Sequence, residues 1–418
     1  MGKIRLQLQK KAILGEVKLS GSKSISNRLL LMAHLANADT RFENLSDSDD
    51  TDKIKKYLHD IEICSASRIP LIVDAGNAGT VFRFLAAYLA MKNGKWLLTG
   101  DKRMKHRPIE GLVNALRDIG AEISYSKKEG FPPLQINGGD LIGNKVKADA
   151  SKSSQFVTAL MLIAPYLEEG LEIELLNNPV SFAYIQMTKN LMNQFGARVK
   201  SDGRTIFVQP GNYDIKDIFI EPDWSSASYW YEFAALADEA EIFLSGFKKE
   251  SIQGDRICET LFKKLGVITK FEKNGMRLKS SALVDEKFEF DFSDYPDLVP
   301  AIMATCAVKK VFATFNGVGH LKYKESDRLK SLSNELKKVG AKFKFAEDSI
   351  SLIPSKTTPV ARPLVFDTYA DHRIAMCLAP MVLKYDHLIV NDPRVVSKSY
   401  PDFWKDIKHL DFADVEEN

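Results

Sequence analysis

A glycine that ends a helix-like run recurs through this chain of 418 residues at a nearly constant spacing. Each glycine is followed by alanine or valine and then by a short alternating segment. The glycines are Gly120, Gly196, Gly266 and Gly340, so the period is about 70 to 76 residues. Glycine takes the left-handed conformation after a helix without a Cβ clash. The pattern therefore predicts a repeated unit of helix, tight stop and strand, which is typical of an α/β fold.

Two weaker copies extend the repeat to both ends of the chain. The runs Lys53 to Leu58 and Phe403 to Leu410 have helical spacing but lack the glycine stop. With them, six units of about 70 residues account for the whole sequence. A chain of 418 residues is also long enough for two domains, each with its own core.

Composition and charge exclude several classes of protein. The chain is 45% apolar and 27% charged, which is ordinary for a globular protein. Its net charge of +3 is too small for a general nucleic-acid or membrane surface. The cysteines are far apart and show no metal-ligand spacing, which favours reduced thiols and argues against structural zinc; they are Cys64, Cys258, Cys306 and Cys377.

The first fifteen residues alternate charged and apolar side chains like a strand and lack the apolar core of a signal peptide, so we expect a cytoplasmic protein. The longest apolar stretch, residues 156–167, is well short of the roughly 20 residues that span a bilayer. It should form a buried helix.

A second feature recurs in the same frame as the glycines. Six apolar helices are predicted to begin with small or polar residues: GSKSISNR before Leu29, GNAGT before Val81, SKSSQ before Phe156, DWSSAS before Tyr229, DYPD before Leu298 and YADHR before Ile374. They can be ordinary N-caps. Alternatively, equivalent repeats direct their helix N-termini to one side, where free N–H groups attract anions.

Basic residues stand beside these helix starts. A helix end contributes about 0.3–1 kcal/mol, whereas micromolar binding needs about 8 kcal/mol, so lysine and arginine must supply most of the affinity for an anion. Each of them can also be a surface salt bridge. Together they indicate one highly anionic ligand or two; the cations next to the helix starts are Lys23, Arg28, Arg83, Lys152 and Arg373.

The order of these motifs resembles the 5-enolpyruvylshikimate-3-phosphate synthase family. The match runs from about Ile13 to Phe403 through GSKSISNR, DAGNAGT, LTGDKRMKHRPI, SKSSQF, PVSFAYI, DWSSASY, YPD, KESDRL, DHRIAM and DPRVVSKSYPDFW. The resemblance implies a two-domain inside-out α/β barrel of six βαβαββ repeats, three in each domain. Residues 21–221 would form one domain, and residues 1–20 with 222–418 the other, with the active site in the cleft between them.

The resemblance also implies a reaction. The 5-hydroxyl of shikimate 3-phosphate would add to phosphoenolpyruvate, and phosphate would then leave, without metal or organic cofactor. The partners would be these two small molecules, with no nucleic acid and no membrane, and the chain would be a monomer. Both substrates carry phosphate and carboxylate groups, which suits a site lined by lysine, arginine and helix ends.

Residue roles follow from the matching motifs. The residues that would bind shikimate 3-phosphate are Lys23, Ser24, Arg28, Ser153, Ser154, Gln155, Ser181, Asp297, His320 and Lys324. Those that would bind phosphoenolpyruvate are Lys23, Gly79, Arg107, Gln155, Arg328, Arg373 and Lys398.

Three residues would handle protons. Asp297 resembles the base for the 5-hydroxyl, although an aspartate there can also be a helix cap. Glu325 or Lys23 would protonate the methylene carbon, and the sequence leaves that choice open. Cations around Lys23 are expected to lower its pKa.

Two positions depart from the family pattern. His320 replaces a common asparagine, and Phe84 stands where many relatives have proline, on the helix that carries Gly79. An alanine in place of Gly79 would crowd the herbicide glyphosate, so the glycine predicts sensitivity. Phe84 could shift this helix.

Three other readings compete with this one. The sister enzymes that use UDP-N-acetylglucosamine usually carry a cysteine in the loop that reads GDKRMKHRP here, and asparagine where Ser24 stands. A kinase would need glycine directly before the lysine in its phosphate loop, and Ser22 intervenes. A non-catalytic anion-binding protein would not need Lys23, Asp297 and Glu325 together.

Overall fold

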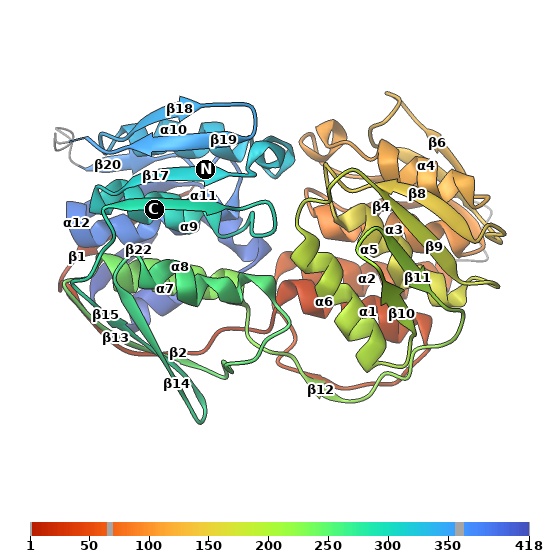
Figure 1. The fold of residues 1–418 in the computed structure, drawn as a ribbon, viewed down its shortest axis with the longest axis horizontal. Helices are drawn as coiled ribbons and strands as arrows, with labels where there is room; N and C mark the ends of the chain where they lie inside the picture. Colours follow the sequence, from red (N-terminus) through yellow and green to blue (C-terminus); the bar gives the residue numbers. More distant parts are fainter. Residues whose placement is uncertain (1, 65–69, 356–362, 418) are drawn as a thin grey trace. The chain divides into compact units, whose positions relative to one another are not determined.

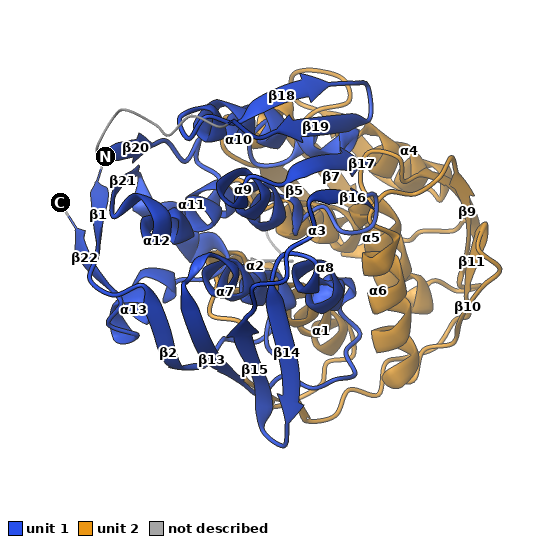
Figure 2. Ribbon diagram, turned by 60° about the vertical axis from the view of Figure 1, so that its left-hand side comes forward, with its two compact units in different colours: residues 1–22, 221–418 blue, residues 23–220 orange. Residues whose placement is uncertain are grey.

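The computed structural model describes residues 2–64, 70–355 and 363–417 (Figure 1). The chain forms two compact units, which Figure 2 distinguishes by colour. Unit 1 contains Met1–Ser22 and Glu221–Asn418, and unit 2 contains Lys23–Ile220. The chain therefore passes from one unit to the other twice, and each unit has its own sheets and helices.

One arrangement of strands and helices recurs in both units. Two parallel strands are joined through a helix, and a second helix then leads into two antiparallel strands that complete a four-stranded sheet. In unit 2, the first complete repeat is β4 (Leu71–Asp74), α3 (Gly79–Met91), β5 (Gly94–Thr99), α4 (Glu110–Asp118), β6 (Glu122–Tyr125) and β7 (Leu134–Gly138). The next is β8 (Lys145–Asp149), α5 (Gln155–Ile163), β9 (Leu171–Leu176), α6 (Phe182–Gln194), β10 (Val199–Ser201) and β11 (Thr205–Val208).

Unit 1 contains three sheets with the same strand order. One repeat is continuous: β16 (Lys287–Asp291), α9 (Val299–Lys309), β17 (Phe312–Asn316), α10 (Arg328–Lys337), β18 (Lys342–Phe345) and β19 (Ser349–Ile353). The other two sheets each take one strand from the start of the chain. β2 (Ala12–Val17) pairs in parallel with β13 (Glu239–Ser245), beside β15 (Gly275–Ser280) and β14 (Val267–Glu272). β1 (Lys3–Leu8) lies between β22 (Ala413–Glu417) and β21 (His387–Asn391). On its other side, β21 pairs in parallel with β20 (Leu364–Phe366).

The sixth repeat is reduced. It contains α1 (Lys23–Leu35), β3 (Phe42–Glu43), α2 (Asp49–Cys64) and β12 (Ile218–Phe219). Among the described residues, its sheet consists of the parallel pair β3 and β12 alone. The sequence predicted a repeat here from the helical run that lacks a glycine stop, and α2 is that helix.

Apolar helices form the centre of each unit. In unit 1, α7 (Trp224–Leu236), α9 and α11 (His372–Leu378) lie between the three sheets, as Figure 2 shows, and nearly every residue of the three is buried. In unit 2, α3 and α5 are buried in the same way. Such helices bury apolar side chains on all sides, which explains why they show little amphipathic periodicity.

The glycine stops are confirmed. Gly120, Gly196, Gly266 and Gly340 have φ of 88° to 102° and end α4, α6, α8 (Cys258–Lys263) and α10. After α4, the amide of Ala121 donates to the carbonyl of Leu116 at 3.0 Å, which is the closing bond of a Schellman motif.

The six predicted helix starts are present, but only some of them are capped by a side chain. Asp223 caps α7 through the amide of Ser226, and Asp371 caps α11 through the amide of Arg373. The reading as ordinary caps is wrong for α3 and α9. Ala78 and Leu298 have no acceptor in their side chains, and Ser154 already has helical backbone angles. At α5, Ser153 provides the cap in place of Ser154, because the amide of Gln155 donates to Ser153 Oγ at 3.3 Å.

Smaller expectations also have clear outcomes. The N-terminal segment forms β1 and β2, and residues 156–167 belong to buried α5 and the following turn. Cys258, Cys306 and Cys377 are free and buried, while the side chain of Cys64 lies outside the described part. None of the helices in the described ranges has the length and apolar character of a membrane crossing.

A glutamate lies in the apolar centre of unit 1. Glu232 on α7 is 0% exposed, and neither carboxylate oxygen has a hydrogen-bond partner among the described residues. Burial raises its pKa well above the usual value. Its charge would raise the pKa of Cys306 and of Cys377 as well, which places it near α9 and α11. An isolated buried carboxyl is stable only in the neutral form.

Stability should therefore depend on Glu232 and pH. Above a pH of about 4.3 the unfolded chain releases this proton while the folded chain keeps it, so stability falls as pH rises, by up to about 1.4 kcal/mol per pH unit. Glu232→Gln cannot ionise and should flatten the slope of unfolding free energy against pH between pH 5 and 8. Exposed Glu239→Gln is the control and should leave the slope unchanged. Equal slopes in parent and Glu232→Gln would contradict a neutral buried carboxyl.

Candidate functional site

The centre of the candidate site in unit 1 is a buried arginine. Arg328 begins α10 and is 1% exposed. Its guanidinium contacts three carboxylates: Nη1 lies 3.2 Å from Asp297 Oδ1, Nη2 lies 2.8 Å from Glu325 Oε2, and Nε lies 3.0 Å from Asp371 Oδ2. Burial alone would lower the pKa of Arg328, but Asp371, Glu325 and Asp297 hold it above its ordinary value.

Asp297 lies between two arginines. Besides Arg328, it contacts Arg373 through Oδ2, which is 2.8 Å from Nη2. Its side chain is 19% exposed, so a ligand can reach the carboxylate. Asp297 comes two residues before the start of α9, and Arg373 is the second residue of α11. The helix starts of neighbouring repeats therefore place these charges together.

His320 is a buried neutral imidazole in this unit. It is 6% exposed, and burial, with a smaller effect of Lys324, lowers its pKa to about 3. Neither ring nitrogen has a hydrogen-bond partner among the described residues. A neutral ring can donate one hydrogen bond and accept another, so His320 adds polar groups to this region without adding charge. Lys398 is buried as well, at the end of the 3₁₀ turn Pro393–Lys398.

Two aspartates near this cluster have roles that the sequence reasoning missed. Asp371 is 0% exposed and accepts hydrogen bonds from Ser326, Arg328 and the amide of Arg373. Asp255 is bonded by Ser225, and burial, strengthened by the charge of Asp297, raises its pKa to about 7. Asp371 stands inside a quoted motif, YADHR, whereas nothing in the repeat pattern indicates Asp255.

In unit 2, Lys23 and Arg28 lie on α1. Lys23 Nζ is 3.2 Å from Asp50 Oδ2, so the expectation that cations surround Lys23 left out a carboxylate. Arg28 is fully buried, and burial lowers its pKa to about 10. Its guanidinium donates to Thr188 Oγ1 at 2.7 Å and to the carbonyl of Ser24 at 2.7 Å, and it lies 5.5 Å from the ring centre of Phe84.

Gly79 begins α3 and lies against two arginines. Arg83 Nη1 donates to the carbonyl of Gly79 at 3.0 Å, and Arg107 Nη1 donates to the carbonyl of Asn77 at 3.1 Å. A Cβ at position 79 would lie 2.6 Å from a guanidinium nitrogen of each arginine. The absence of a side chain at Gly79 therefore lets both cations reach the start of α3.

The remaining predicted residues of unit 2 lie at the starts of α5 and α6. Gln155 Nε2 donates to Thr80 Oγ1 at 2.8 Å, which joins the start of α5 to that of α3. Ser154 and Ser181 are buried, and Ser181 precedes α6 with a φ of 58°. Helix starts thus hold Lys23, Ser24, Gly79, Gln155 and Ser181, whereas Arg107 and Lys398 lie at the ends of 3₁₀ turns.

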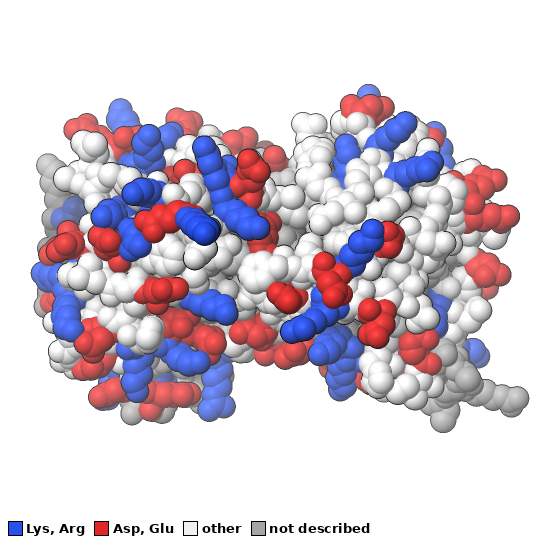
Figure 3. Space-filling view, turned by 90° about the horizontal axis from the view of Figure 1, so that it is seen from below, with Lys and Arg blue, Asp and Glu red and all other residues white. Residues whose placement is uncertain are grey.

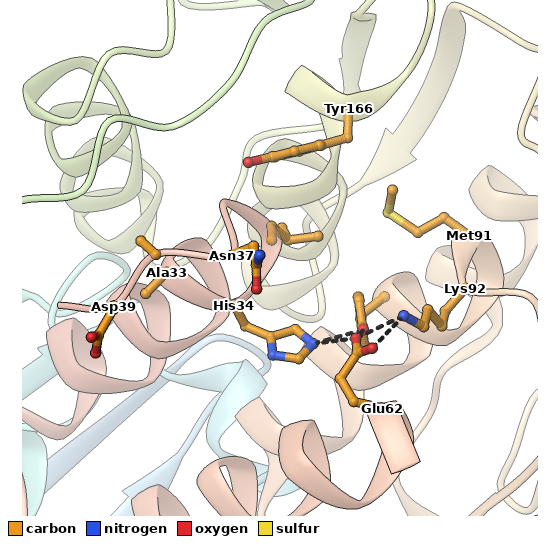
Figure 4. Close-up of a pocket in the computed structure, with 11 residues that line it drawn as sticks. Ala33, His34, Asn37, Asp39, Glu62, Met91, Lys92 and Tyr166 are labelled. Atoms are coloured by element: carbon orange, nitrogen blue, oxygen red, sulfur yellow. Dashed lines mark hydrogen bonds and ion pairs between the residues drawn. The ribbon is translucent and has the colours of Figure 1, made fainter. Parts of the chain in front are cut away.

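A pocket of about 720 Å³ lies elsewhere in unit 2 (Figure 4). Its lining comes from the C-terminal ends of α1, α2 and α3, where Glu62 accepts from Lys92 at 2.7 Å and from Tyr88 at 2.9 Å. Lys23 and Gly79 are at the opposite ends of α1 and α3, and a helix of 13 residues is about 20 Å long. This pocket is therefore separate from the predicted site.

The charges on the surface show no dominant sign. Figure 3 shows lysine and arginine interspersed with aspartate and glutamate over the face in view. Among the described residues, no group of three or more histidine, cysteine, aspartate or glutamate side chains has the arrangement of a metal site. The concentrated charge is instead buried, at the helix starts described above.

The repeats and the clustered charges define a class: an α/β protein of two units with cations at several helix starts. Comparison with known proteins then gives the family. The family model described as EPSP synthase (3-phosphoshikimate 1-carboxyvinyltransferase) matches residues 8–407. The chain belongs to the EPSP synthase family.

Individual relatives agree with this assignment. A 3-phosphoshikimate 1-carboxyvinyltransferase of Bacteroides fragilis (strain YCH46) is 40% identical over 398 residues, covering 95% of both chains. One from Sulfurovum sp. (strain NBC37-1) is 36% identical and covers 95% of this chain and 96% of its own. The solved EPSP synthase of Acinetobacter baumannii has a TM-score of 0.77 at 21% identity over the full length of both chains, which confirms the two-domain inside-out α/β fold.

The cluster around Arg328 gives a stability prediction. Asp371→Asn keeps the shape of the side chain but removes the carboxylate whose two oxygens both accept from Arg328. Losing one partner of a buried ion pair should reduce the free energy of unfolding by about 3 kcal/mol, measured by urea denaturation. The exposed pair of Asp238 and Lys384, 2.8 Å apart, is the control, and Asp238→Asn should cost less than about 1 kcal/mol. Equal losses in the two variants would contradict the dominant role of the buried cluster.

Proposed function

We propose that this chain transfers the enolpyruvyl group of phosphoenolpyruvate to the 5-hydroxyl of shikimate 3-phosphate and releases phosphate. Similarity to named 3-phosphoshikimate 1-carboxyvinyltransferases over 95% of the chain supports the reaction. The observation that carries the chemistry is Asp297, a reachable carboxylate between Arg328 and Arg373. An acceptor hydroxyl needs a base, and an anionic donor needs cations, and here the two kinds of group are in contact.

Addition is the first step. Asp297 takes the proton of the 5-hydroxyl, the hydroxyl oxygen bonds to C2 of phosphoenolpyruvate, and C3 gains a proton. Lys23 or Glu325 delivers that proton. In the second step C3 returns a proton to Lys23 or Glu325, the double bond between C2 and C3 re-forms, and the bond from C2 to the phosphate oxygen breaks. The leaving phosphate takes up the proton held by Asp297. The atoms balance without an oxidant, a reductant or a further group.

The contacts of Asp297 suggest how substrate activates the base. In this structure its carboxylate forms ion pairs with Arg373 Nη2 and Arg328 Nη1. The carboxylate of phosphoenolpyruvate competes for the same guanidinium groups, because arginine binds planar carboxylates through parallel hydrogen bonds. When the substrate takes these contacts, Asp297 loses its cationic neighbours and becomes a stronger base.

Substrate binding is divided between the two units, which we propose as the two domains of the enzyme, residues 21–221 and residues 1–20 with 222–418. Unit 2 supplies the phosphate and ring contacts for shikimate 3-phosphate from Lys23, Ser24, Arg28, Ser153, Ser154, Gln155 and Ser181, and unit 1 adds Asp297, His320 and Lys324. For phosphoenolpyruvate, unit 2 supplies Lys23, Gly79, Arg107 and Gln155, and unit 1 supplies Arg328, Arg373 and Lys398.

We also propose that the protein works as a cytoplasmic monomer without a nucleic-acid partner. A net charge of +3 and the mixed surface in Figure 3 support the absence of a nucleic-acid surface. The mass of the chain is 46.9 kDa, and light scattering of purified protein should give this value. A mass twice as large would contradict the monomer.

The function is tested by phosphate release from purified protein supplied with phosphoenolpyruvate and shikimate 3-phosphate, with each substrate alone as a control. Release should require both substrates and should survive a metal chelator. UDP-N-acetylglucosamine is the alternative acceptor, and release with it instead would favour the sister reaction. Binding of both substrates without release would favour an inactive scaffold.

Two substitutions separate chemistry from binding. Asp297→Ala removes the base, so kcat should fall by about 10²–10⁴, with a smaller change in the KM for phosphoenolpyruvate. Arg107→Ala removes a cation, and the KM for phosphoenolpyruvate should therefore rise by about 10- to 150-fold. Steady-state kinetics of both variants measure the two constants. Turnover of Asp297→Ala at the parental rate would refute the base assignment.

Gly79→Ala tests the close approach of the two arginines. The new Cβ would lie 2.6 Å from guanidinium nitrogens of Arg83 and Arg107, so both must move. The KM for phosphoenolpyruvate should rise about tenfold or more, because Arg107 shifts from its carbonyl contact. Gly211→Ala, with nothing within 4 Å of its Cβ, is the matched control.

Millimolar glyphosate should inhibit the parent and act more weakly on Gly79→Ala. Identical kinetics in the two alanine variants would disprove the steric argument.

A further inference from the structure

A buried carboxylate on a neighbouring helix holds the ammonium of Lys23. Lys23 is the first residue of α1, and Asp50 lies in the first turn of α2. Lys23 Nζ and Asp50 Oδ2 are 3.2 Å apart, and the side chains are 15% and 4% exposed. Burial of a carboxylate is costly unless it is paired, so this contact is far less dispensable than a surface ion pair.

A buried network of hydroxyl and amide groups fixes the start of α2 against α1. Ser26 Oγ accepts from the amide of Ser46 at 3.0 Å, and Thr51 Oγ1 donates to Asn27 Oδ1 at 2.9 Å. Between them, Ser48 Oγ lies 3.0 Å from the hydroxyl groups of both Ser46 and Thr51. All five side chains are buried. Thr51 adjoins Asp50, so the network sets where the Asp50 carboxylate meets Lys23.

We propose that Asp50 is a positioning residue for the transfer reaction, because its carboxylate fixes the Lys23 ammonium at the start of α1. The inference rests on the proposed function, in which Lys23 contacts both substrates. A lysine side chain has about 2 kcal/mol of rotamer entropy to lose. A carboxylate that holds the ammonium in the free enzyme removes part of this cost before substrate binds.

The opposing explanation is that Asp50 merely stabilises α2. A carboxylate in the first turn of a helix interacts favourably with the macrodipole, whatever it contacts. Asp52 lies in the same turn and is exposed, so it shares that role without the contact to Lys23. Asp50→Asn and Asp52→Asn therefore remove the same charge from the same helix end, and only Asp50→Asn releases Lys23.

The experiment has a chemical readout and a kinetic one. Trace labelling of the full chain with acetic anhydride, followed by mass spectrometry, measures the reactivity of the Lys23 amine. Asp50→Asn should raise its labelling severalfold and lower kcat/KM for phosphoenolpyruvate at least about tenfold, mainly through KM. Asp52→Asn should match the parent in both. Asp50→Glu keeps the charge and should retain much of the protection, which provides a second variant if Asp50→Asn folds poorly.

Unchanged labelling of Lys23 in Asp50→Asn would overturn the proposal, because the carboxylate would then not hold the ammonium. Increased labelling with the kinetics of Asp52→Asn would also overturn it, since the contact would not serve the reaction. Failure of the parent to release phosphate from both substrates would be a different result. It would refute the proposed function, while the labelling comparison would still decide whether Asp50 restrains Lys23.

Discussion

Burial of the Arg328 guanidinium is the constraint on which the candidate site of unit 1 depends. The Arg328 guanidinium is 1% exposed, and the carboxylates around it compensate its buried charge. Those carboxylates come from separate places in the chain: Asp297 precedes α9, Glu325 precedes α10, and Asp371 caps α11. Satisfying one cation therefore fixes the starts of three helices. Two of these helices, α10 and α11, have a capping aspartate, whereas the N-cap residue Leu298 of α9 forms no side-chain cap.

Unit 2 reaches a similar result with neutral groups. Arg28 is fully buried, yet its hydrogen-bond partners are a hydroxyl and backbone carbonyls, with the Phe84 ring 5.5 Å away. Burial lowers the pKa of Arg28 to about 10, which still leaves the guanidinium charged at neutral pH. In the described part of the chain no carboxylate contacts Arg28, so its charge is not compensated by an ion pair. Arg328, by contrast, has its charge compensated by Asp297, Glu325 and Asp371.

The repeat could be predicted from the sequence because it depends on local backbone conformation. A positive φ after a helix selects glycine, so the four glycines show where α4, α6, α8 and α10 end. Polar residues likewise show where the six apolar helices begin. The reduced sheet of β3 and β12 could not be predicted, since the strands are two residues long and pair across about 175 residues of sequence. The resemblance placed residues 1–20 with the C-terminal part of the chain, but it did not indicate which strands β1 pairs with.

The candidate site was predictable only as far as its motifs reach. Resemblance supplied the residues expected to touch substrate, but the residues that hold them depend on contacts between distant segments. Arg328 and Asp371 are 43 residues apart, and Lys23 and Asp50 are 27 apart. Asp255 bonds Ser225 from 30 residues away and gives no local signal. Charge pairing of this kind depends on which helix starts become neighbours, which is a property of the tertiary fold.

Phe84 illustrates how such a contact changes the meaning of a substitution. The sequence raised the possibility that replacing proline with phenylalanine shifts the helix that carries Gly79. In the structure α3 runs without interruption from Gly79 to Met91, with Phe84 inside it. A proline at this position would lack the amide that an interior helical residue donates, whereas phenylalanine keeps it. Its ring is 0% exposed and lies 5.5 Å from the Arg28 guanidinium. Phenylalanine therefore keeps the helical hydrogen bond that proline would lose. Its ring also packs against Arg28, a cation expected to bind shikimate 3-phosphate, so a substitution at position 84 should affect Arg28 as well as the helix that carries Gly79.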